Sequence, residues 1–356
     1  HYLPSRLPES LHRDIRGLRH HFTRWAGTQA DAPPIVLLHG FMDCGVTFQF
    51  VADAIAPSRS LIAPDWRGFG RSGWNPQGYW FPDYFADLDA MLEWLAPGTP
   101  VDLVGHSMGG NVAMIYAGLR PGRVHRLVTL EGFGLPGAPP ELAPGRYRDW
   151  LDQWRDPEPA AVFPSLDVFA GVLRKRNPRL AAERADFVAR AWSEPLPDGR
   201  VRPCFDPAHK RVNPILYRRA EVEACWAEVR APLLYVAGEE SDFLERLQGA
   251  GAPEKVRRLV PQLEPRVVAA AGHMVHPDQP AAVAQLVQLE RALGLAQAHE
   301  VVDLAVRVAG DVRQHGLARR PLVEPVDGHD GEQLVDGPAV GQRLEHREIA
   351  EVDVRK

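Results

Sequence analysis

The sequence predicts an α/β fold: a mostly parallel sheet with helices on both faces and an inserted helical cap. Three observations predict it. Short apolar runs alternate with helical patterns over residues 16–133 and 229–294, an aromatic-rich stretch at 134–228 interrupts them, and a glycine-flanked serine separates a strand pattern from a helix pattern. Strands that alternate with helices are typical of parallel sheets, because crossover helices join parallel strands.

The elements of the first part follow from apolar runs and stop signals. Residues 1–15 show no periodicity, so we expect a weakly ordered lead-in and regular structure from near Gly17. The expected strands are 18–25, 35–38, 60–63, 101–104 and 126–130. A helix is expected at 111–119, because Arg120, Pro121 and Gly122 end its pattern.

The second part begins with the interruption at 134–228. This stretch is rich in proline, arginine and aromatic residues and is expected to form a mostly helical cap. Strands are expected again at 232–237 and 266–270, and a helix near 281–293. Residues 295–356 contain no aromatic residue, serine or threonine, so we expect a poorly packed or disordered tail.

Composition limits the classes of partner that the protein is expected to bind. The net charge is -5 over 356 residues, without a dense basic block, which argues against nucleic acid. No apolar run approaches the roughly 18–20 residues that cross a bilayer, so we expect a soluble, cytoplasmic protein without membrane contact. The three cysteines are widely separated and suggest no zinc site. A small-molecule substrate is the expected partner, and the oligomeric state stays open.

A candidate nucleophile lies in the sequence Gly105-His106-Ser107-Met108-Gly109. A tight strand-to-helix turn needs small neighbours on both sides of a serine whose hydroxyl must stand exposed. The N–H groups at the start of the following helix favour negative charge, so Met108 is expected to donate to an oxyanion. Phe41, in the turn after 35–38, is the second expected donor.

A base and an acid should follow the serine along the chain. His273, after the last strand, is the expected general base, whereas the nearby His276 is given a structural or rim role. Two carboxylates preserve the order serine, acid, histidine. Asp242 is preferred, Glu131 is the alternative, and Glu240 is a weaker third choice.

These motifs resemble the α/β-hydrolase superfamily, and specifically its capped, esterase-like serine-hydrolase branch, over residues 16–294. The motifs are His39-Gly40, Asp65-Trp66-Arg67-Gly68-Phe69-Gly70-Arg71-Ser72, Gly105 to Gly110 and Gly272-His273. The resemblance implies eight strands, a lid after the sixth strand, and catalysis without metal or organic cofactor. Related dehalogenases and epoxide hydrolases use an aspartate nucleophile where this chain has Ser107. Glu131 stays in contention, since the dehalogenase acid has the same separation of 24 residues from its nucleophile.

The expected activity is hydrolysis of an ester or related acyl bond of a small hydrophobic substrate through an acyl-enzyme on Ser107. Trp150, Trp154 and Phe133 are expected to bind the substrate, because aromatic rings offer large apolar contact areas. The same triad would also suit a carbon–carbon bond hydrolase, a thioesterase, a lactonase or a cofactor-free perhydrolase. The alternative outside the enzymes is a non-catalytic ligand-binding protein with the same fold.

Overall fold

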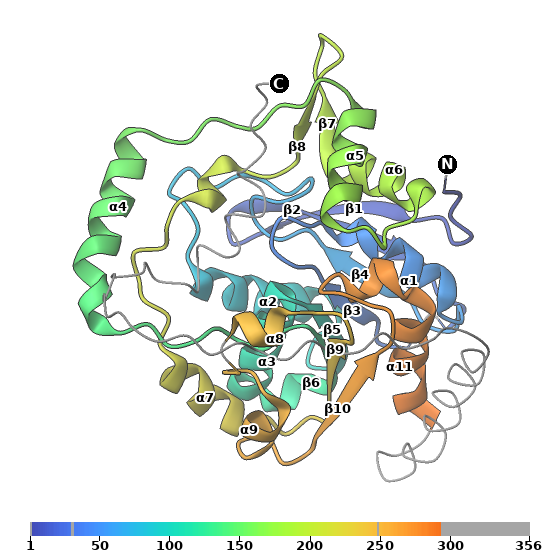
Figure 1. Cartoon of the computed structure of the whole chain (residues 1–356). Coiled ribbons are helices and arrows are strands. Elements are labelled where there is room, and N and C mark those ends of the chain that lie inside the picture. The colour runs from blue at the N-terminus through green and yellow to red at the C-terminus, as the bar shows by residue number, and fades with distance from the viewer. Residues whose placement is uncertain (1, 30–31, 248, 293–356) are drawn as a thin grey trace, which may run out of the picture.

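An eight-stranded sheet forms the centre of the molecule (Figure 1). The structure is a computed structural model that describes residues 2–29, 32–247 and 249–292. The strand order is β1-β2-β4-β3-β5-β6-β9-β10, and only the pairs β1–β2 and β2–β4 are antiparallel. The strands span Glu9–Ile15, Leu18–Trp25, Leu61–Pro64, Ile35–Leu38, Val101–His106, Val124–Leu130, Leu233–Gly238 and Leu263–Val268, in that order. The predicted mostly parallel sheet is confirmed.

Both faces of the sheet are covered, because its central strands are apolar on both sides. In β3, Ile35 and Leu37 belong to one apolar cluster, while Val36 and Leu38 belong to another. The first cluster packs against α1 (Gln49–Ala54) and α11 (Pro280–Ala292), and the second against α2 (Phe81–Leu95), α3 (Met108–Leu119) and α7 (Arg219–Ala227). This two-sided burial confirms the predicted helix layers (Figure 1).

The N-terminal segment differs from the predicted lead-in. Strand β1 pairs with β2 along its whole length, from Glu9 opposite Arg24 to Ile15 opposite Leu18. Arg16 and Gly17 join the two strands with φ values of 50° and 77°. Two successive positive φ values are typical of the tight turns that match the twist of a hairpin. The sequence reasoning missed the hairpin because an arginine is an unusual first residue for such a turn.

The predicted cap region contains more than helices. Between β6 and β9 lie α4 (Ala143–Arg155), α5 (Leu166–Arg176), α6 (Ala182–Ala191) and a ribbon of β7 (Ser193–Pro195) and β8 (Val201–Pro203). Helix α7 follows, but it packs against α3, with Trp226 fully buried in the core. The boundary predicted at residue 228 is therefore too late, because α7 belongs to the core.

The last part of the described chain contains short elements around the carboxyl ends of β9 and β10. These are α8 (Phe243–Arg246), α9 (Pro253–Arg257) and α10 (Val275–Asp278). Strand β10 (Leu263–Val268) begins three residues before the predicted 266–270 and ends two residues sooner. Ala270 has a φ of 54°, which lies outside the β region. No helix in the described ranges is long and apolar enough to cross a membrane. The predicted tail at 295–356 lies outside the described residues.

Candidate active site

Ser107 occupies a strained turn between β5 and α3. Its φ of 48° and ψ of -115° are rare for a residue with a side chain. A Cβ at Gly105 would come within 2.5 Å of the carbonyl oxygen of Gly109, and one at Gly109 would clash with the carbonyl oxygen of Leu38. The small residues that the motif predicted are therefore required by close backbone packing, and they hold the serine at the sheet edge.

The two expected oxyanion donors belong to neighbouring turns. Met108 is the first residue of α3, where backbone N–H groups have no partner within the helix. Phe41 follows Gly40, where an added Cβ would meet the Cβ of Ser107 at 3.3 Å. The turn after β3 thus packs directly against the nucleophile turn, which supports both donors as candidates.

His273 is hydrogen-bonded to Glu131. The His273 Nδ1 atom lies 3.1 Å from Glu131 Oε2, and the Glu131 side chain is fully buried. The same carboxylate accepts the Gly238 N–H at 2.7 Å and the Ser241 hydroxyl at 2.7 Å. Because three donors hold it, Glu131 is fixed as the acceptor that orients the imidazole and leaves Nε2 for a proton from elsewhere.

This geometry corrects the prediction that Asp242 is the acid. Asp242 forms an ion pair with Arg246 at 2.9 Å, and 60% of its side chain is exposed. Glu240, the third choice, pairs with Arg179. After β9 the chain turns so that the Ser241 hydroxyl reaches Glu131, the carboxylate beside His273. The side chains of Glu240 and Asp242 pair with arginines instead. Glu131 is the acid that the structure places against the imidazole.

Sequence reasoning missed the two groups that support Glu131 from β9. Gly238 and Ser241 appear in the sequence as an ordinary turn after a strand. The pairing of β6 with β9 brings them to Glu131, which is the first residue after β6 and has a φ of 58°. Neither this unusual backbone angle nor the strand order is visible in the local sequence, although Glu131 itself was among the candidates.

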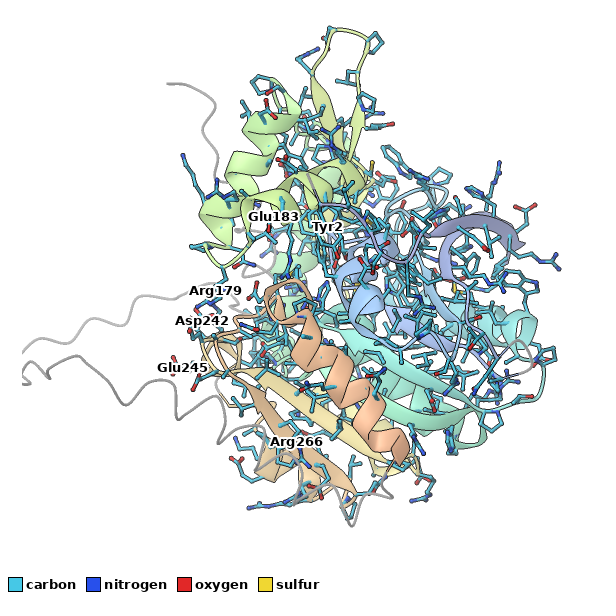
Figure 2. The ribbon with its side chains drawn as sticks, turned by 90° about the vertical axis from the view of Figure 1, so that its right-hand side faces the viewer. Tyr2, Arg179, Glu183, Asp242, Glu245 and Arg266 are labelled. Carbon is cyan, nitrogen blue, oxygen red and sulfur yellow. The ribbon has the colours of Figure 1, made fainter. Side chains whose placement is uncertain are left out.

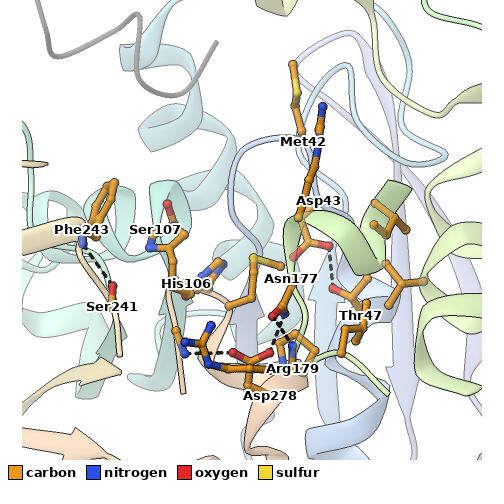
Figure 3. A pocket seen from close by; sticks show the side chains of 18 of the residues that line it. Met42, Asp43, Thr47, His106, Ser107, Asn177, Arg179, Ser241, Phe243 and Asp278 are labelled. Carbon is orange, nitrogen blue, oxygen red and sulfur yellow. Dashed lines mark hydrogen bonds between the residues drawn. The ribbon is translucent and has the colours of Figure 1, made fainter. Parts of the chain in front are cut away.

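A cavity of about 290 Å³ is lined by Ser107, His273 and Phe41, among others. Figure 3 shows Ser107 and His106 among the residues that line it, together with Asn177 and Arg179 from the cap. The apolar cap residues that line it are Leu173, Leu180, Val188 and Trp192. The site therefore lies between the core and the α5–α6 part of the cap.

The three predicted substrate-binding aromatics lie elsewhere. Phe133 is fully buried in the core, where its ring lies beside those of Tyr235 and Phe243. Trp150 and Trp154 are on α4, which has no buried residue, and neither lines the cavity. None of the three lines the cavity beside Ser107, because aromatic content alone does not show which side chains face the site.

Polar contacts join the cap to the core beside the cavity. Arg179 of the cap pairs with Glu240, and Figure 2 shows Arg179 facing the loop that carries Asp242. Asn177 donates to Asp278 Oδ1 at 2.6 Å. These charged and polar residues line the cavity together with the apolar side chains of the cap.

A buried polar cluster, Asp43, His106 and His276, lies behind the nucleophile turn. His106 Nε2 donates to the carbonyl oxygen of His273 at 2.9 Å. His276 is fully buried and stacks on Phe48, so it does not lie at the rim of the cavity. Burial would raise the pKa of Asp43, but its contact with His276, together with His39 and Thr47, brings that pKa to about 2.

Comparison with known proteins identifies the class. Residues 33–280 match the family model for the alpha/beta hydrolase fold, and the chain belongs to this family.

The chain is 26% identical over 254 residues to 2-(acetamidomethylene)succinate hydrolase of Mesorhizobium japonicum, covering 71% of this chain and 85% of that protein. It is 26% identical over 291 residues to the sn-1-specific diacylglycerol lipase of Mus musculus, covering 78% and 87%. Among solved structures, the thioesterase domain from the curacin biosynthetic pathway superposes with a TM-score of 0.68 at 26% identity, covering 79% of this chain and 99% of that domain. Family and relatives together make this chain a hydrolase.

Proposed function

We propose that this hydrolase is a serine esterase that works through an acyl-enzyme on Ser107. The observation that carries the proposal is the hydrogen bond between His273 and the buried Glu131, in a cavity that also contains the strained Ser107. A serine hydroxyl is a weak nucleophile without a base, and a base needs a fixed orientation. The described residues supply a serine, a base and a carboxylate that orients the base.

In the proposed reaction, His273 Nε2 takes the proton of the Ser107 hydroxyl while the serine oxygen attacks the acyl carbonyl. The oxyanion that forms accepts hydrogen bonds from the backbone N–H groups of Phe41 and Met108, each worth about 3–4 kcal/mol in such sites. His273 then gives its proton to the leaving alcohol. Water, activated by the same histidine, hydrolyses the acyl-enzyme and restores Ser107.

The substrate should be small and carry an apolar acyl group. A volume of about 290 Å³ lies at the lower end of small-molecule sites. The cap contributes aliphatic side chains and Trp192 to the lining. A thioester is the second candidate, because the chain resembles a thioesterase domain. Rates measured on an oxoester and a thioester of one acyl group would distinguish the two activities.

Labelling with a fluorophosphonate probe tests the nucleophile. We expect one adduct per chain, located at Ser107 by peptide mass spectrometry, and no adduct in the Ser107→Ala variant. Ser241 is the internal control, since its hydroxyl also lines the cavity but donates to Glu131. An adduct at Ser241, or an unlabelled wild-type protein that is folded, would contradict the proposed mechanism.

A further inference from the structure

The polar cluster of Asp43, His106 and His276 contains buried atoms without hydrogen-bond partners. These are Asp43 Oδ2, His106 Nδ1 and both ring nitrogens of His276, of which Asp43 Oδ2 and His276 Nε2 lie 3.4 Å apart without a hydrogen bond between them. The three residues are between 0% and 3% exposed. Buried polar groups normally have partners, so a group of unsatisfied atoms in one place indicates an occupant such as a water or an ion.

The donor set of the cluster favours an ion. The carbonyl oxygen of His273 can only accept a hydrogen bond, so the proton of His106 is on Nε2 and its Nδ1 presents a lone pair. Asp43 contributes a carboxylate oxygen and His276 a ring nitrogen, and one such atom from each of the three residues lies close to the others. Imidazole nitrogens and a carboxylate oxygen are ready metal ligands.

The distances suit a small transition metal ion. His276 Nε2 lies 3.4 Å from Asp43 Oδ2, close to the separation of about 3.3 Å between ligand atoms around tetrahedral zinc. One ligand atom from each residue lies within 4.8 Å of the others, so modest side-chain rotation would close the set. Asp43 and His106 also line the cavity, which provides an entry path.

From this geometry we infer that Asp43, His106 and His276 form a binding site for Zn²⁺ or a similar borderline-soft divalent ion. Two imidazole nitrogens and one carboxylate oxygen are typical zinc ligands, whereas Mg²⁺ and Ca²⁺ prefer all-oxygen sets. Asp43 Oδ1 stays bound to the Thr47 hydroxyl at 2.6 Å and the Trp192 indole at 2.8 Å, which fixes the carboxylate. A water from the cavity that Asp43 and His106 line would supply the fourth ligand.

Occupation of this site would inhibit the enzyme, a consequence that rests on the proposed function. Coordination through His106 Nδ1 would turn the imidazole and weaken its hydrogen bond to the carbonyl oxygen of His273. The proposed base would then lose a backbone restraint, and ester hydrolysis would fall. Removal of the ion with a chelator would restore the rate.

Zinc binding can be measured without any activity. Equilibrium dialysis of the wild-type protein should give one bound Zn²⁺ per chain, with Mg²⁺ in excess present throughout. We expect His276→Gln and Asp43→Asn to weaken binding at least tenfold. His125→Gln, a change of the same kind at a half-exposed histidine that pairs with Asp102, should leave it unchanged. His273→Gln should also retain binding, which separates this site from one on the proposed triad.

Unmodified protein provides a test that does not depend on the folding of variants. Crystals soaked with one equivalent of Zn²⁺ should show anomalous scattering between the three side chains. A peak at His273 or at the surface, or none anywhere, overturns the inference, as does unchanged binding in a folded His276→Gln variant. If zinc occupies the cluster but no ester is cleaved and no probe reacts, the proposed function fails and the metal site stands.

Discussion

Single side chains decide which carboxylate serves the proposed base. We expect Glu131→Gln to lower kcat for ester hydrolysis by about 10²–10⁴-fold, because an amide cannot stabilise the imidazolium and can disturb its tautomer. Asp242→Asn, the matched change at an exposed carboxylate, should stay within about twofold of wild type. Initial rates on a short aryl ester, with thermal unfolding to verify the fold, measure both. An equal loss in both variants would return Asp242 to the site.

Among single residues, the sequence identifies those that belong to short local motifs. Ser107 and His273 are both found from their motifs, and both line the same cavity. The acid is harder, since Glu131 and Asp242 both follow strands and both satisfy the chain order. The choice depends on the pairing of β6 with β9 and on the direction of each side chain after its strand, which are properties of the folded chain.

The close contact between helices α3 and α7 leads to a prediction about the packing of secondary-structure elements. A Cβ on Gly118 would overlap the carbonyl oxygen of Cys225 in α7, so Gly118→Ala must push the two helices apart. We expect a loss of about 1–3 kcal/mol in the free energy of unfolding. Gly171→Ala is the control within α5, where a Cβ would meet nothing, and there we expect a gain of up to about 1 kcal/mol. Urea denaturation measures both, and a neutral Gly118→Ala would contradict the close approach.

Elements are predicted well where the local pattern and the burial agree. The apolar run of β3 is buried on both sides, and its predicted and observed bounds coincide at residues 35–38. Strand β1 was missed because most of its residues are exposed, so its apolar pattern is weak. Helix α7 was assigned to the cap because the sequence cannot show that Trp226 turns toward the core.

The whole molecule is held together partly by Asp87, which joins three distant segments. Its carboxylate on α2 accepts from Arg67 at 2.6 and 2.7 Å and from Arg16 of the N-terminal hairpin at 2.9 Å, and His20 lies 3.4 Å away. Burial would raise the pKa of Asp87, but its contacts with His20 and Arg67 outweigh burial and bring that pKa to about 2.

A depressed pKa in the folded state makes this network sensitive to acid. The ionised carboxylate stabilises the fold fully above its unfolded value of about 3.9, and this contribution is lost as the pH falls toward about 2. It amounts to about 2–3 kcal/mol of unfolding free energy. Asp87→Asn should be less stable at pH 7 by about 3 kcal/mol or more, because it leaves Arg67 buried without its charge partner.

The pH series separates this network from other acid-sensitive groups. Between pH 5 and pH 3, the unfolding free energy of Asp87→Asn should fall less steeply than that of wild type, since the variant has no proton to take up at this position. Asp242→Asn is the exposed control and should follow the wild-type curve. Urea titrations at each pH give the free energies. Parallel slopes for Asp87→Asn and wild type would show that another carboxylate carries the acid dependence, with Asp43 the next to test because its pKa is also about 2.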